Sequence, residues 1–99
     1  MRARRRREAG GARVVFDSLR PELPRGGRVL EIGPKHGLDT RLLATLEPRE
    51  LVTVDLAEKA DEIASWLPEV PVARHVEANV LYLDERERAE LGRFDLVWC

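Results

Sequence analysis

Four short apolar segments, spaced evenly along the chain, constrain its fold more than any other feature of the sequence. They are RVLEI (28–32), ELVTVDL (50–56), VARHVEA (72–78) and FDLVW (94–98). Their valines and leucines are nearly continuous, which is typical of strands that are covered on both faces. The sequence therefore predicts four buried strands, in a chain whose 99 residues amount to one domain at most.

Helical patterns occupy the intervals between these strands and the segment before the first one. The expected helices cover residues 11–20, 38–47, 57–67 and 84–92. In the second helix one face carries leucines 38, 42, 43 and 46. In the third, the spacing of a buried helix face is kept by Ala60, Ile63, Ala64 and Leu67.

The first and last of these helices carry further signals. Val15 and Leu19 lie four residues apart in the segment before the first strand. Asp84 followed by Glu87 resembles a capping box, in which each residue bonds the backbone of the other. Gly92 ends the last helix in the manner of a C-terminal glycine.

The alternation of strands and helices determines the expected topology. Strands separated by helices of this length form a parallel sheet with right-handed crossovers. The sequence therefore predicts an α/β chain that is the first half of a Rossmann-like, doubly wound sheet, with strand order 3-2-1-4. We expect residues 12–99 to be a partial domain, truncated after the fourth strand. The alternative is a small protein that completes its sheet with a partner chain.

Composition narrows the class of protein. No apolar run approaches the roughly 20 residues of a membrane span, and the N-terminus has no apolar stretch typical of a secretory signal. The single cysteine, Cys99, excludes an internal disulfide and a cysteine-built metal site. We therefore expect a cytoplasmic protein with no membrane partner and no metal. Five arginines within residues 2–7 predict a disordered basic head at 1–11. Their positive charge leaves open a contact with nucleic acid.

The turn after the first strand is the expected binding site, because ligands of parallel sheets lie beyond the carboxyl ends of the strands. Here LEIGPKHGLDT (30–40) places an acid, two glycines and a helix start close together. Glycines permit a tight turn and a close approach of the backbone to a ligand. A dinucleotide loop would need glycines where Lys35 and Leu38 stand, and no Gly-Lys-Ser/Thr of a phosphate loop follows.

The same residues are similar to another family. VLEIGPKHG followed by LVTVDL resembles the class I S-adenosylmethionine-dependent methyltransferases. In that comparison the first motif is Glu31, Gly33 and Gly37, with Lys35 where the middle glycine of the family stands. The second motif is Asp55, the acid that ends the second strand.

Two later segments extend the resemblance. EANVLYL puts Asn79 where the family has Asp or Asn near the adenine, and RFDLVWC resembles the fourth strand, which leads to the catalytic loop. The resemblance implies S-adenosylmethionine as the cofactor and methyl transfer as the activity, with this chain supplying the cofactor-binding half. The catalytic residues and the methyl acceptor stay unassigned, since they belong to the part of the family that follows the fourth strand.

The resemblance also implies a role for each site residue. Glu31 would orient the methionine end, directly or through water, and Asp55 would accept hydrogen bonds from both ribose hydroxyls. Asn79 would bond the adenine edge, while Gly33 and Gly37 would let the backbone lie against the ligand. Two residues depart from the family pattern. The side chain of Lys35 would either point outward to solvent or narrow the pocket, and Pro34 removes one N–H donor from the turn.

Simpler interpretations stay open beside these. Glu31 could be a strand-end acid paired with an arginine, Asp55 a helix-entry acid, and Asn79 a turn residue. His36 is interpreted as a loop residue and His75 as a strand residue, neither with a role in catalysis. The alternative functions are a non-catalytic nucleoside-binding or scaffold module of the same fold, and an NAD-type dinucleotide-binding domain.

Overall fold

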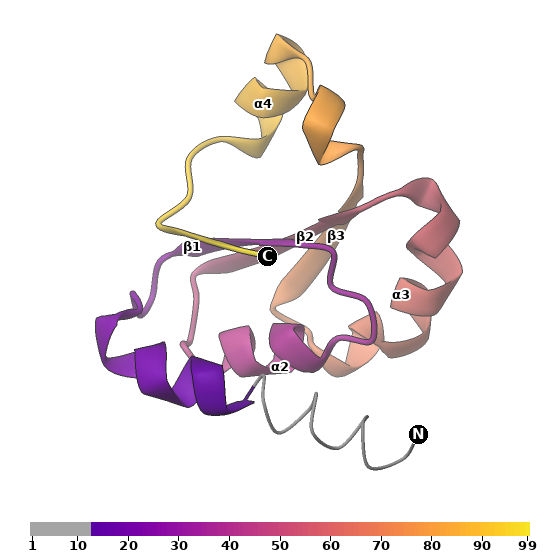
Figure 1. The fold of residues 1–99 in the computed structure, drawn as a ribbon. Helices are drawn as coiled ribbons and strands as arrows, with labels where there is room; N and C mark the ends of the chain where they lie inside the picture. The colour runs from indigo at the N-terminus through magenta and orange to yellow at the C-terminus, as the bar shows by residue number, and fades with distance from the viewer. Residues whose placement is uncertain (1–12) are drawn as a thin grey trace.

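The computed structural model describes residues 13–99 (Figure 1). The expected disordered head at 1–11, and the nucleic-acid contact considered for its arginines, therefore lie outside the described residues. The described part begins with helical residues 13–19. It continues through η1 (Arg20–Glu22), β1 (Arg28–Ile32), α2 (Leu38–Ala44), β2 (Glu50–Asp55), η2 (Ala57–Lys59), α3 (Ala60–Trp66), η3 (Leu67–Glu69), β3 (Ala73–Glu77), η4 (Val80–Tyr82), α4 (Glu85–Leu91) and β4 (Leu96–Trp98).

The four strands form one parallel sheet in the order β3-β2-β1-β4, which confirms the predicted fold class and strand order. Helices cover both faces of this Rossmann-like sheet: α4 lies on one side, and α2 with residues 13–19 lies on the other (Figure 1). Right-handed crossovers place the helices after β1 and β2 on one face. The reversal of strand order after β3 carries α4 to the opposite face.

Each face of the sheet has its own hydrophobic core. On the α2 side the core consists of Phe16, Val29, Leu42, Leu43, Leu46 and Leu51. On the α4 side it consists of Leu30, Val52, Val54 and Leu91. Successive residues of β1 and β2 thus reach opposite cores, which is why these two segments are apolar without interruption. Burial of each such side chain contributes about 1.5–3 kcal/mol, so both helical layers are held mainly by β1 and β2.

The prediction that all four strands are covered on both faces is wrong for β3 and β4. The interior residues of β1 and β2 are buried, whereas every position of β3 and β4 is either partly buried or exposed. Val97 on β4 is 54% exposed. These are the edge strands of the sheet in the described residues, and an apolar run does not distinguish an edge strand from a central one.

The first helical segment buries a residue that the sequence analysis did not select. Val15 and Leu19 are 51% and 37% exposed, whereas Phe16 between them is fully buried. The Phe16 ring meets the Trp98 ring edge-to-face, with centroids 5.9 Å apart. This contact with β4 turns the helical segment so that Phe16, rather than Val15 and Leu19, faces the sheet.

Two later helices also differ from prediction at one position each. Of the four leucines predicted on one helix face, three are buried, but Leu38 in the first turn of α2 is 42% exposed, and α2 ends at Ala44, before Leu46. In α3 Ala64 is exposed, while Ile63 and Trp66 are buried. The Trp66 indole N–H donates to the carbonyl of Lys35 at 2.8 Å. That bond ties this helix to the turn after β1, so its buried face includes Trp66 and excludes Ala64.

The predicted start and stop of α4 are confirmed. The Asp84 carboxylate accepts from the Glu87 N–H at 2.7 Å, and the Glu87 carboxylate accepts from the Asp84 N–H at 3.3 Å. Gly92 caps the other end with φ of 80°. The local sequence was sufficient here because both caps are made by residues that lie within one turn of the helix.

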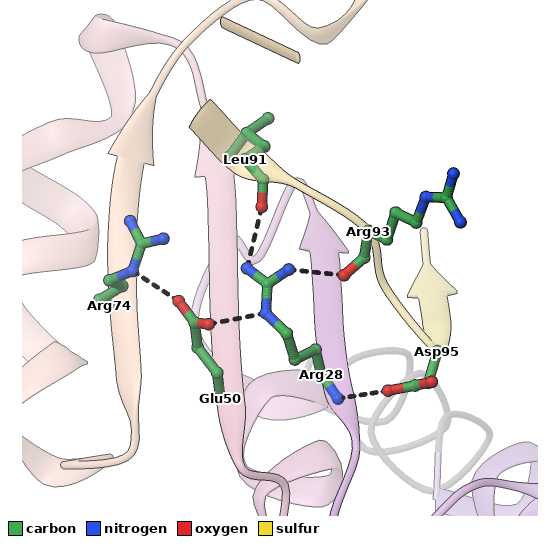
Figure 2. Close-up of polar contacts among 6 residues, drawn as sticks. All are labelled: Arg28, Glu50, Arg74, Leu91, Arg93 and Asp95. Atoms are coloured by element: carbon green, nitrogen blue, oxygen red, sulfur yellow. Dashed lines mark hydrogen bonds and ion pairs between the residues drawn. The ribbon is translucent and has the colours of Figure 1, made fainter. Parts of the chain in front are cut away.

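A network around Arg28 joins the amino ends of the strands to the end of α4 (Figure 2). Arg28 Nε donates to Glu50 Oε2 at 2.8 Å, and its two terminal nitrogens donate to the carbonyls of Leu91 at 2.9 Å and Arg93 at 2.5 Å. The other Glu50 oxygen accepts from Arg74 Nε at 2.9 Å. Hydrogen bonds from Arg28 and Arg74 lower the pKa of Glu50. The network lies at the opposite end of the sheet from the predicted binding turn.

The first residue of β1 also holds the segment that leads into β4. The Arg28 N–H donates to the Asp95 carboxylate at 2.8 Å, and the Asp95 N–H donates to the Arg28 carbonyl at 2.8 Å. Because the Asp95 side chain takes the place of a backbone acceptor, regular pairing begins at Leu96. The fourth strand is therefore shorter than the predicted 94–98.

Candidate functional site

The turn between β1 and α2 adopts a backbone conformation that glycine prefers at three positions. Gly33, Lys35 and Gly37 have φ of 71°, 52° and 79°. Left-handed backbone costs a residue with a side chain about 1–2 kcal/mol. Lys35 thus keeps the conformation expected of the glycine it replaces in the family pattern, and the departure changes the side chain more than the course of the turn.

Much of the hydrogen-bonding capacity of this turn is already used within the protein. The Gly33 N–H donates to the Val54 carbonyl at 2.9 Å, and the Gly37 N–H donates to the Pro34 carbonyl at 2.9 Å. Pro34 has no N–H. A pyrophosphate is held by several free backbone N–H groups at such a turn. Three of the five residues from 33 to 37 therefore offer no free donor.

A hollow beside this turn brings three of the predicted site residues together. Its volume is about 240 Å³, and we call it the Asp55 hollow. It is lined by Ile32, Gly33, Val54, Asp55, Leu56, Ala78, Asn79, Val80 and Leu81. Gly33, Asp55 and Asn79 come from the ends of three neighbouring strands, so the parallel sheet is what assembles them.

A second, larger hollow adjoins the first. Its volume is about 480 Å³, and we call it the Lys35 hollow. It is lined by Ile32, Gly33, Pro34, Lys35, His36, Leu38, Asp39 and Cys99. Ile32 and Gly33 belong to both linings, so the two hollows lie on either side of the end of β1.

Asp55 is half-buried at the end of β2 and keeps part of its hydrogen-bonding capacity. Its Oδ1 accepts from the N–H of Leu56 at 2.8 Å, and within residues 13–99 its Oδ2 has no hydrogen-bond partner. The Asp55 backbone carbonyl accepts from the Ala78 N–H at 3.0 Å, which fixes the segment after β3 beside it. One carboxylate oxygen is therefore available to a ligand in the Asp55 hollow.

Asn79 is a turn residue, as one of the two interpretations held. Its Oδ1 accepts from the Leu81 N–H at 3.1 Å and caps η4. The side chain is exposed and lines the Asp55 hollow, so its amide NH₂ stays available as a donor. The turn role does not compete with the predicted adenine contact, which remains a prediction.

Glu31 lies inside the protein and lines neither hollow. It is 2% exposed, and one of its oxygens accepts a hydrogen bond from the Thr40 hydroxyl in α2. Burial raises the pKa of Glu31 to about 7, an effect that the Thr40 bond opposes and the nearby Asp39 charge reinforces. The alternative of a pairing with arginine is not observed among residues 13–99, where the partner is Thr40.

Gly37 makes its close approach to a tryptophan. A Cβ added to Gly37 would lie 2.5 Å from the nearest atom of the Trp66 indole. The space beside Gly37 is therefore filled by α3, and Gly37 lines neither hollow. Gly33 differs, because it lines both hollows and an added Cβ would meet nothing within 4 Å.

Asp39 is a site residue that the sequence analysis missed. It lines the Lys35 hollow, and its Oδ2 accepts from the Trp98 indole N–H at 3.1 Å. The only available signal was its place two residues after Gly37, in the first turn of α2. Its importance depends on Trp98, which lies 59 residues further along the chain.

The two histidines have partners that set their roles. His36 is exposed, and its Nδ1 lies 2.8 Å from a Glu62 oxygen on α3. His75 Nδ1 lies 2.7 Å from the Thr53 hydroxyl, and its Nε2 is buried without a partner in the described residues. Burial lowers the pKa of His75, which the charges of Asp55 and Glu77 oppose. His75 is thus a packed residue of the sheet, and it lines neither hollow.

Comparisons with known proteins add no family assignment. No protein-family model matches the sequence, and no curated protein is significantly similar to it. Across residues 13–99, no group of three or more His, Cys, Asp or Glu side chains is arranged to hold a metal ion. In the same part of the chain no helix has both the length and the apolar character needed to cross a membrane.

Proposed function

We propose that this chain binds S-adenosylmethionine as the cofactor-binding half of a methyltransferase. The observation that carries the proposal is the Asp55 hollow, where Gly33, Asp55 and Asn79 line one cavity. These residues come from three separate motifs that resemble the family. Their convergence supports the proposal beyond the resemblance of each motif alone.

The residues of the Asp55 hollow fit a nucleoside. The free Asp55 oxygen suits a ribose diol, and the Asn79 amide can donate to an adenine nitrogen. Leu56 and Leu81 provide apolar walls against which a base can pack. The remainder of the ligand would extend past Gly33 into the Lys35 hollow, since both hollows share that residue.

The chain would supply the donor side of the transfer. When bound, S-adenosylmethionine supplies a methyl group on a sulfonium, which an acceptor displaces in line. Such a step is accelerated mainly by holding the two reactants in position. We assign to this chain the binding of the nucleoside, and we assign no methyl acceptor. An exposed free thiol at Cys99 suits the reducing cytoplasm, which is the compartment we propose.

An NAD-type site is less well supported. The Gly33 and Gly37 N–H groups are already bonded within the protein, and Asp39 adds a negative charge beside the turn. Both features disfavour a pyrophosphate. A non-catalytic nucleoside-binding module would use the same Asp55 hollow. It would differ from a methyltransferase in binding the nucleoside without transferring a methyl group.

Titration calorimetry of the chain with S-adenosylhomocysteine and with NAD tests the proposal. We expect saturable binding of S-adenosylhomocysteine with a stoichiometry of one, and much weaker binding of NAD. Tighter binding of NAD would overturn the assignment in favour of a dinucleotide site. Binding of neither compound would remove the cofactor assignment altogether.

A further inference from the structure

The outer edge of β3 has no strand beside it in residues 13–99, because only β2 pairs with this strand. The Ala78 N–H donates to the Asp55 carbonyl at 3.0 Å, so the backbone of Ala78 faces β2. Successive residues of a strand direct their N–H and C=O groups to opposite sides. Those of His75 and Glu77 therefore face the open edge, where a further strand can bond to them.

A groove lies along this edge, between β3 and α4. Its volume is about 210 Å³, and we call it the β3 groove. The residues that line it include Arg74, Val76, Ala78, Leu83, Glu87 and Leu91. Its apolar residues belong to the core on the α4 side of the sheet or pack against that core. The groove thus extends this core to the edge of the sheet, where no element of residues 13–99 covers it.

Two opposite charges in the β3 groove keep free hydrogen-bonding capacity. Arg74 is 53% exposed, and its Nε donates to Glu50 (Figure 2). Its two terminal nitrogens have no partner in the described residues. Glu87 uses Oε1 to accept from the Asp84 N–H, and its Oε2 has no partner in the same part of the chain. The groove therefore offers both a cation and a carboxylate to whatever covers it.

Antiparallel pairing of two copies of β3, about an axis at Val76, would use the free backbone groups of both. His75 of each copy would lie opposite Glu77 of the other, and each such pair exchanges two hydrogen bonds. Val76 would meet Val76 on the α4 face, which places apolar surface against apolar surface at the axis.

The same register brings the free charges together. Arg74 of one copy would lie opposite Ala78 of the other, which lines the same groove as Glu87. Arg74 can then pair with Glu87 of the second copy, and the two-fold axis repeats the contact. An axis at Arg74 would instead place two arginines directly opposite each other, which is unfavourable.

We propose that the chain forms a two-fold dimer through the outer edges of β3, with Arg74 of each copy entering the β3 groove of the other to pair with Glu87. A two-fold interface buries the same surface on both copies, and a surface that holds Arg74 and Glu87 is complementary to itself. The other edge strand of the described residues, β4, is three residues long, whereas β3 has five.

The dimer does not depend on the proposed function. It joins two four-stranded sheets into one, in which the strands of the two copies run in opposite directions. The carboxyl ends of the strands, and with them the two Asp55 hollows, then lie at opposite ends of the joint sheet.

Sedimentation equilibrium over a range of concentrations tests the proposal with two charge reversals. The wild-type chain should have twice its mass of 11.3 kDa. In Arg74→Glu the two contacts become glutamate against glutamate, and in Glu87→Arg they become arginine against arginine. Each variant alone should therefore dimerise at least about 100-fold more weakly, since like charges across an interface are costly.

Mixing the two variants in equal amounts should restore a dimer. Both contacts of the mixed dimer again join a glutamate and an arginine, so a mass of two chains should return. The matched controls are Arg49→Glu and Glu58→Arg, at exposed residues that do not line the β3 groove. They make the same changes of charge and should leave the dimer unchanged.

A third variant tests the backbone pairing. Glu77→Pro removes an N–H that faces the open edge, and edge strands tolerate proline at such a position. Circular dichroism should show that this variant keeps its fold, while sedimentation should show a monomer.

Three results would overturn the proposal. The first is a wild-type chain that stays monomeric up to about 1 mM. The second is a wild-type dimer that neither Arg74→Glu nor Glu87→Arg weakens, because the interface would then lie elsewhere. The third is a pair of monomeric variants that form no dimer when mixed, because Arg74 and Glu87 would then not meet across the axis.

Discussion

Gly37 lies so close to Trp66 that an added Cβ would come within 2.5 Å of the indole ring. The same indole donates its N–H to the carbonyl of Lys35, two residues earlier. One tryptophan on α3 therefore shapes both the middle and the end of the turn that lines the Lys35 hollow. The contact gives Gly37 a structural role that differs from that of Gly33, which has the same left-handed backbone but no such neighbour.

Gly37→Ala should destabilise the chain more than Gly33→Ala. In Gly33→Ala the cost is backbone strain alone, about 1–2 kcal/mol. Gly37→Ala adds a clash that displaces Trp66 and weakens its bond to Lys35, so we expect about 3 kcal/mol in total. Urea denaturation of both variants gives the comparison. Equal free energies of unfolding for the two variants would show that Trp66 moves away without cost. Only the left-handed φ of Gly37 would then disfavour alanine at that position.

The buried carboxyl of Glu31 should make stability fall as pH rises toward neutrality. Its pKa is about 7 in the folded chain against an ordinary 4.5. The folded state therefore binds more protons than the unfolded state between these values. The contribution is fully present below pH 4.5 and is lost as pH rises through about 7, amounting to about 3 kcal/mol.

Glu31→Gln isolates this contribution, because the amide is always neutral and can still accept from Thr40. The wild-type free energy of unfolding, measured relative to that of Glu31→Gln, should decline between pH 4.5 and 7. Glu50 and His75 titrate with the opposite sign, since their pKa values are lowered, but they are common to both proteins and cancel in the difference. A difference that is constant with pH would mean that the pKa of Glu31 is the same in the folded and the unfolded chain.

Asp55→Ala should weaken ligand binding and change stability little. The substitution removes the oxygen proposed to accept from the ribose, and a hydrogen bond to a charged group contributes about 1.5–3 kcal/mol. Affinity for S-adenosylhomocysteine should therefore fall roughly 10–150-fold. The bond from the Leu56 N–H is also lost, at a half-exposed site where we expect less than about 1 kcal/mol.

The measurement pairs calorimetric affinity with melting temperature for Asp55→Ala and for the exposed control Asp61→Ala. The control should match wild type in both readouts. Unchanged affinity together with a large drop in melting temperature would identify Asp55 as a structural acid. The proposed nucleoside grip would then lose its principal residue.

Arg28→Lys should destabilise the fold although the charge is kept. Arg28 bonds Glu50 and the carbonyls of Leu91 and Arg93 at once, and its side chain is 20% exposed (Figure 2). A lysine can replace only part of this fork, so we expect a loss of about 2 kcal/mol, or roughly 8–16 °C in melting temperature. Arg74→Lys is the matched control, because Arg74 makes one bond to Glu50 and is 53% exposed. It should cost less than about 0.5 kcal/mol, and an equal loss in both variants would contradict a special role for Arg28.

The sequence by itself determined the order and type of the elements, and with them the topology. Strand and helix patterns are local, and right-handed crossovers allow few ways to arrange them, so the order β3-β2-β1-β4 followed without knowledge of any contact. The capping box of α4 was equally local. The meeting of Gly33, Asp55 and Asn79 also followed, because the ends of neighbouring parallel strands lie at one edge.

Only the tertiary structure decided which side chains face a ligand and which face the interior. Glu31 is buried because α2 packs over it. The Trp66 ring from α3 fills the space beside Gly37, and the Trp98 indole from β4 orients the Asp39 carboxylate. Each of these facts depends on how two separate elements meet, at an angle set by the packing of whole cores. A pattern along one segment carries no information on that angle, so burial and partner become readable only when the elements are assembled.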